Sequence, residues 1–108
     1  MKVLILEDEM KHDPIWEKVK KVLDYRGYES QRVLRVERVF EYLSKEEIDL
    51  VIIHHYDFSD VDAIKEKYPD TPCAGFSGSL VCFNHQSIVP GSILEVLKEE
   101  FEPHYDHL

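Results

Sequence analysis

The chain has 108 residues, of which 44% are hydrophobic, and a formal net charge of −9 at pH 7. This length suits one domain with a single core, and the hydrophobic share argues against a disordered chain. The negative charge would repel a phosphate backbone, so we expect no binding to nucleic acid.

The sequence shows no sign of a membrane segment or a secretion signal. No apolar run approaches the roughly 20 residues of a membrane span, and the N-terminus lacks the pattern of a signal peptide. The two cysteines, Cys73 and Cys82, have neither C-x-x-C spacing nor a disulfide-rich context. We therefore expect a cytoplasmic protein with reduced thiols and no contact with a membrane.

In the first half of the chain, strand and helix patterns alternate. Residues 3–6 form an apolar run, typical of a buried strand, and Asp13 and Pro14 predict the start of a helix. Gly27 predicts the end of that helix, at the position after the last turn where glycine is favoured. Residues 28–34 are more polar and predict a strand near a sheet edge. A second helix follows, with these apolar side chains on one face: Val36, Val39, Phe40 and Leu43.

The second half begins with a buried-strand pattern at residues 49–58 (DLVIIHHYDF). Its continuous apolar run is typical of a strand covered on both faces of a parallel sheet, and it breaks into two histidines, a tyrosine and an acid. A short third helix follows, then a fourth strand at residues 73–76 and a fifth around residues 87–89. Ser92 predicts the start of a last helix, and we expect the tail, residues 102–108, to be loose.

Strands that alternate with helices predict a single doubly wound α/β domain over residues 1–108. We expect a parallel five-stranded sheet in the order 2-1-3-4-5, with helices on both faces. In that order the carboxyl ends of the first and third strands are neighbours, at the point where open α/β sheets carry their sites. Three acids would then face two histidines, and these residues are Glu7, Asp8, Glu9, His54 and His55.

Residues 2–9 (KVLILEDE) resemble the opening of a response-regulator receiver domain, in which an acidic pair ends the first strand. Residues 49–53 resemble the third strand of that family, and residues 71–77 resemble its fourth, which ends in a threonine or serine. The resemblance covers nearly the whole chain and implies a flavodoxin-like fold and a role in signal transduction. It matches the family's acidic pair and its hydroxyl residue to Glu7, Asp8 and Ser77.

Other positions of the family's phosphorylation site are changed. His54 stands where the family has the aspartate that accepts a phosphoryl group, Val89 where it has a lysine, and Gln86 where it has an aromatic residue. A histidine cannot form an acyl phosphate, and without the lysine a phosphorylated state has lost its positive partner. The degenerate pocket would consist of Glu7, Asp8, His54, Ser77 and Val89.

These changes imply a pseudo-receiver that regulates without being phosphorylated. Such a module would act by binding a protein partner or by pairing with a second copy of itself as a homodimer. We expect no enzymatic activity and no cofactor.

The acidic cluster leaves a second interpretation open. Paired carboxylates suit a hard divalent cation, and a neighbouring imidazole shifts the preference towards zinc, manganese, iron or nickel. Glu7, Asp8 and His54 would then form a metal-binding or metal-dependent hydrolytic site. In the plainer interpretation, the acids form a solvated loop and His54 is a hydrogen-bonded histidine at a strand end.

The segment between the predicted fourth and fifth strands is short. Residues 78–88 must turn the chain, return it and begin a strand, whereas a full crossover with its helix takes at least about 10–12 residues. We therefore expect a truncated or missing fourth helix. An apolar cluster in this segment either folds back over the sheet or forms a partner surface. That surface would consist of Leu80, Val81, Phe83 and Ile88.

Overall fold

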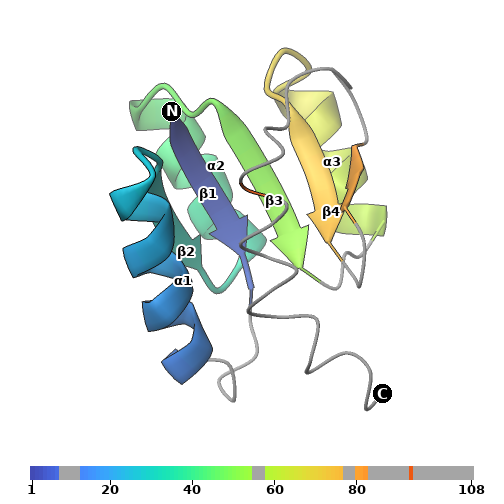
Figure 1. Cartoon of the computed structure of the whole chain (residues 1–108). Coiled ribbons are helices and arrows are strands. Elements are labelled where there is room, and N and C mark those ends of the chain that lie inside the picture. The colour runs from blue at the N-terminus through green and yellow to red at the C-terminus, as the bar shows by residue number, and fades with distance from the viewer. Residues whose placement is uncertain (8–12, 55–57, 77–79, 83–92, 94–108) are drawn as a thin grey trace.

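A computed structural model of the chain describes residues 1–7, 13–54, 58–76, 80–82 and 93. The chain alternates strands and helices in an α/β fold, as predicted (Figure 1). Its elements are β1 (Lys2–Leu6), α1 (Asp13–Tyr25), β2 (Glu29–Val33), α2 (Val36–Lys45), β3 (Leu50–His54), α3 (Phe58–Lys67), β4 (Cys73–Phe76) and β5 (Leu80–Cys82).

The sheet has the strand order β2-β1-β3-β4-β5, and the first four strands in this order are parallel to one another. Helix α1 covers one face, and α2 and α3 cover the other (Figure 1). In strand β1, which lies between β2 and β3, Leu6 is level with Val33 of β2 and with Ile53 of β3. The carboxyl ends of these three strands therefore lie side by side.

The edge of the sheet differs from the expected parallel arrangement. The strand that pairs with β4 is β5, and it runs antiparallel, with Gly75 level with Val81. Three residues separate the two strands, and so short a connection permits a hairpin but no parallel crossover. The sheet is therefore mixed, and the apolar Leu80–Cys82 segment forms its edge strand.

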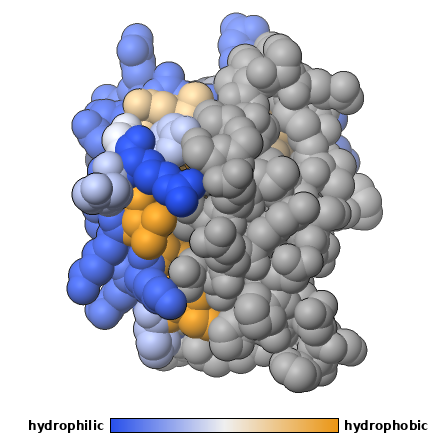
Figure 2. Space-filling view, viewed as in Figure 1, coloured by the Kyte–Doolittle hydropathy of each residue, from blue (hydrophilic) through white to orange (hydrophobic). Residues whose placement is uncertain are grey.

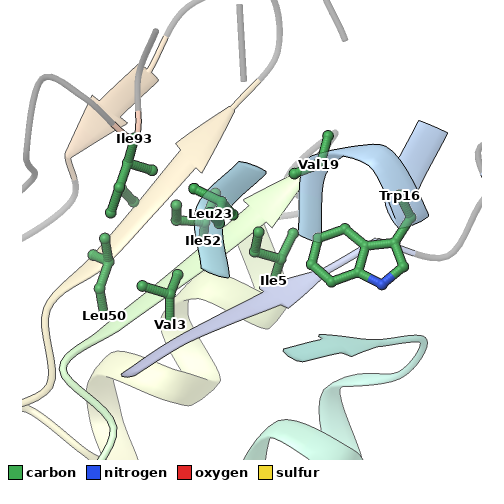
Figure 3. Close-up of a cluster of buried hydrophobic side chains, with 9 residues drawn as sticks. Val3, Ile5, Trp16, Val19, Leu23, Leu50, Ile52 and Ile93 are labelled. Atoms are coloured by element: carbon green, nitrogen blue, oxygen red, sulfur yellow. The ribbon is translucent and has the colours of Figure 1, made fainter. Parts of the chain in front are cut away.

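Strand alternation divides the core into two layers, because successive side chains of a strand point to opposite faces. The α1 face contains Val3, Ile5, Trp16, Val19, Leu23, Leu50, Ile52, Ala74 and Ile93 (Figure 3). The face under α2 and α3 contains Leu4, Leu6, Val33, Val39, Val51, Ile53, Val61, Ile64 and Cys73. Both faces of β3 are thus buried, which explains its unbroken apolar sequence.

Helix α1 lies on the sheet through its apolar face, and the described part of its outer surface is mostly hydrophilic (Figure 2). The helix ends as the sequence predicts. Gly27 has a φ of 89°, its N–H donates to the carbonyl of Asp24 at 3.1 Å, and the N–H of Tyr28 donates to that of Leu23 at 2.9 Å. These two bonds form a Schellman motif, and the left-handed conformation explains the glycine.

Some predicted features lie outside the described residues. They are the fifth strand around residues 87–89, the last helix apart from Ile93, the tail 102–108, and Asp8, Glu9, His55, Ser77, Phe83, Gln86, Ile88 and Val89. The extent of the domain over residues 1–108 also stays a prediction. Within the described part of the chain, no helix is long and apolar enough to cross a membrane.

Candidate functional site

Three ionisable side chains meet at the carboxyl ends of the central strands. Glu7 follows β1 directly, His54 ends β3, and Arg32 lies one residue before the end of β2. Each continues the alternating set of side chains that faces α1, as Ile5 and Ile52 do. Parallel pairing and strand alternation together therefore place all three on the same side of the sheet.

Glu7 is a buried carboxylate that is held by an arginine. Its side chain is 0% exposed, and that of Arg32 is 10% exposed. Arg32 Nη2 lies 2.9 Å from Glu7 Oε2, and Arg32 Nε donates a hydrogen bond to the Glu7 carbonyl at 3.1 Å. The Glu7 N–H in turn donates to the Val33 carbonyl at 3.0 Å. A buried charge needs a partner of opposite sign, and Arg32 supplies it.

The second carboxylate oxygen of Glu7 faces a histidine. His54 Nδ1 lies 3.2 Å from Glu7 Oε1, and the His54 side chain is only 2% exposed. An ionised carboxylate only accepts hydrogen bonds, so beside an ionised Glu7 the hydrogen would be on Nδ1. Glu7 is therefore contacted on one oxygen by a guanidinium and on the other by an imidazole.

Arg32 also connects this pair to the start of α1. Its Nη1 contacts Asp13 Oδ1, which belongs to the first residue of the helix and is largely exposed. Asp13 and Pro14 begin the helix as predicted, and the described contact of the Asp13 carboxylate is to Arg32. The guanidinium thus bridges two carboxylates from separate segments.

The structure brings together part of the predicted site. Glu7 and His54 meet, in agreement with the expected approach of the first and third strands. His54 is a buried, hydrogen-bonded residue at a strand end, which matches the plainer of its two predicted roles. The other predicted pocket residues are Asp8, Ser77 and Val89, and they lie outside the described ones.

Arg32 was missed by the reasoning from sequence. The signal was present, because Arg32 is two residues from Ser30 on a strand that neighbours β1, and that spacing assigns both to one face. A long basic side chain near the carboxyl end of a strand adjacent to an acid is a ready ion-pair partner. Strand order and alternation place Arg32 on the same face of the sheet as Glu7, but their contact also needs the register of β1 and β2, which local patterns do not give.

The metal site predicted from the sequence needs the Glu7 carboxylate, and the described surroundings of Glu7 do not fit a cation. Arg32 Nη2 lies 2.9 Å from Glu7 Oε2, so a cation on this carboxylate would lie close to a positive guanidinium. Across the part of the chain that the structure describes, no group of three or more histidine, cysteine, aspartate or glutamate side chains is arranged to hold a metal.

A groove of about 510 Å³ lies at the opposite end of β1 and β2. Its two lysines are engaged: Lys20 Nζ donates to the Ser30 carbonyl at 2.7 Å, and Lys2 Nζ lies 3.3 Å from a Glu46 carboxylate oxygen. None of the three ionisable residues at the carboxyl end, Glu7, Arg32 and His54, lines it. The groove therefore contributes nothing to the charge cluster.

Comparison with known proteins supports the fold. No family model matches the chain, and no curated protein matches it. Among solved structures, the chain is similar to a response regulator from Thermotoga maritima, with a TM-score of 0.56 and 23% identity. The match covers 68% of this chain and 63% of that one, so the chain spans less than two thirds of its length. This likeness shows that the chain has a receiver-like α/β fold.

Proposed function

We propose that this protein is a receiver-like regulatory module that works through protein contacts and without accepting a phosphoryl group. The proposal rests on the side chains at the carboxyl end of β3, where a receiver has its phosphoacceptor. There, His54 is buried and bonded to Glu7, and Glu7 is ion-paired with Arg32.

Two properties of His54 argue against phosphorylation. An imidazole cannot form the acyl phosphate of an aspartate, and a side chain that is 2% exposed gives a phosphoryl donor little access to its nitrogen atoms. A phosphohistidine would also place new negative charge beside the Glu7 carboxylate, which is unfavourable at short distance.

The charge balance of the cluster supports regulation by contact. A receiver of the usual kind changes state when a phosphoryl group alters the charge of its pocket. Here Arg32 already supplies a positive partner for the buried Glu7 carboxylate, so neither a phosphoryl group nor a metal is needed to balance that charge. Regulation would then depend on which protein the module binds.

The proposed contact surface includes β5. This strand is at the edge of the sheet, and an edge strand presents backbone groups that another chain can pair with. The proposed surface comprises Leu80, Val81, Phe83 and Ile88, and its occupant is a protein partner or a second copy of this chain.

A metal-dependent role is the alternative, and it would use Glu7, Asp8 and His54. The Arg32 ion pair disfavours it, because a cation at Glu7 would have to lie close to a positive guanidinium.

Phosphorylation is tested by incubating the purified protein with acetyl phosphate and Mg²⁺ and measuring its intact mass. We expect no added phosphoryl group on the wild type or on His54→Asp, and an addition on an ordinary receiver treated in parallel. A wild-type protein that gains a phosphoryl group would overturn the proposal.

The contact surface is tested by sedimentation equilibrium of the wild type and of Leu80→Ser/Phe83→Ser. If the occupant is a second copy, the wild type dimerises and the double variant stays monomeric with an unchanged circular dichroism spectrum. If the wild type stays monomeric, a second copy is excluded as the occupant of this surface, and a different protein remains as the proposed partner. A double variant that unfolds would assign these residues to the core and refute the surface.

A further inference from the structure

Arg32 is held at three points near the carboxyl end of the sheet. Nη2 lies 2.9 Å from Glu7 Oε2, Nε donates to the Glu7 carbonyl at 3.1 Å, and Nη1 contacts Asp13 Oδ1. These contacts use all three nitrogen atoms of the guanidinium, and the Arg32 side chain is 10% exposed. Such a rigid, planar and permanently charged group is suited to a fixed ion pair.

The position of this guanidinium is incompatible with a metal ion on the same carboxylate. A hard divalent cation binds carboxylate oxygens at about 2.0–2.6 Å. Around Glu7, Oε2 faces the guanidinium and Oε1 faces the His54 ring. An added cation would share the carboxylate with a fixed positive charge, in a place where burial leaves little water to screen their repulsion.

We infer that Arg32 is a built-in cation that takes the place of a divalent metal at Glu7, so that this buried carboxylate has a counter-charge without any metal. This inference rests on the proposed function, because it explains how a receiver-like pocket keeps its shape with neither cation nor phosphoryl group. Arg32 acts here as a positioning residue, since it fixes Glu7 against β2 and the start of α1.

The inference predicts that removing the guanidinium makes the pocket responsive to a metal. Arg32→Met keeps an unbranched apolar stem but takes away the guanidinium that lies 2.9 Å from the buried Glu7 carboxylate. Mn²⁺, used as the probe, should then raise the melting temperature of Arg32→Met. It should not raise that of the wild type or of Arg32→Lys, which keeps a positive charge.

The double variant Glu7→Gln/Arg32→Met is the matched control, because it lacks both the guanidinium and the carboxylate. Its melting temperature should not respond to Mn²⁺, which would assign the response of Arg32→Met to Glu7. If Arg32→Met is unfolded without metal, recovery of its circular dichroism spectrum on adding Mn²⁺ replaces the melting shift.

Two results would overturn the inference. One is an Arg32→Met protein that shows neither a melting shift nor recovery of structure in Mn²⁺. The other is a wild type that binds Mn²⁺ in calorimetry and loses that binding in Glu7→Gln. A wild type that binds Mn²⁺ through Glu7 but takes no phosphoryl group from acetyl phosphate would refute the inference and leave the proposed function standing.

Discussion

Replacing Arg32 by methionine should destabilise the protein strongly, because it isolates a buried charge. The Glu7 side chain is 0% exposed, and Arg32 is its ion-pair partner at 2.9 Å. Removing one member of a buried ion pair typically costs about 3–5 kcal/mol, most of it from the charge left behind. Small domains have a free energy of unfolding of about 5–15 kcal/mol, so this loss is a large share of it.

Two control variants test whether this loss of stability comes from the buried Glu7 charge or from the contact of Arg32 with Asp13. Asp13→Asn removes the other carboxylate that Arg32 contacts, but that side chain is 54% exposed, and exposed ion pairs contribute about 0–1 kcal/mol. Glu7→Gln/Arg32→Met leaves no charge buried in this pair and should cost about 1–3 kcal/mol, the penalty for an unsatisfied polar group. The double variant should therefore be more stable than Arg32→Met alone.

Urea unfolding monitored by circular dichroism measures these differences. With a slope of about 2 kcal/mol per molar urea, Arg32→Met should lower the unfolding midpoint by about 1.5–2.5 M. A loss below about 1 kcal/mol for Arg32→Met, or a double variant no more stable than Arg32→Met, would refute the assignment of Arg32 as the essential counter-charge of Glu7.

Three further substitutions, one of them with an exposed control, test other parts of the structure. His54→Leu removes the imidazole that bonds to Glu7 and should cost about 1–3 kcal/mol of stability. A cost above that of Arg32→Met would contradict the expectation that the Arg32 contact contributes more to stability than the His54 contact. Ile52→Ala leaves a cavity in the core at a residue that is 1% exposed, and should cost about 2–5 kcal/mol in urea unfolding. Its control is Tyr25→Ala, at a residue that is 92% exposed, which should change stability by less than about 0.5 kcal/mol. Gly27→Ala should cost about 1–2 kcal/mol because its φ of 89° is unfavourable for a residue with a Cβ, and an unchanged midpoint would argue against the Schellman motif.

Local patterns were sufficient to predict most of the described elements. The apolar run before Glu7 and the run before His54 gave β1 and β3, and Gly27 marked the end of α1 at the correct residue. These predictions succeed because they depend on burial and backbone conformation, which are encoded over a few residues. The antiparallel β5 was not predicted. The direction of β5 depends on the three-residue connection after β4. The sequence of that connection is equally compatible with a hairpin and with the start of a shortened crossover.

The candidate site was predicted only in part, for a different reason. The meeting of Glu7 and His54 follows from strand order, and that part was correct. Arg32 is separated from Glu7 by 25 positions, and no sequence motif connects them. Their contact arises from the register of β1 and β2, which sets Ile5 level with Arg32. Register is a tertiary property, so a reading of local patterns treats Arg32 as one more charged residue on an edge strand.

The most direct test of the central claim is a crystal structure grown with both Mg²⁺ and Zn²⁺ and inspected around Glu7 and His54. We predict that the Arg32 guanidinium lies against Glu7 Oε2, that His54 Nδ1 bonds to Glu7 Oε1, and that no cation coordinates either residue. A metal ion coordinated by Glu7 or His54, with Arg32 displaced, would contradict the account and favour the metal-dependent alternative.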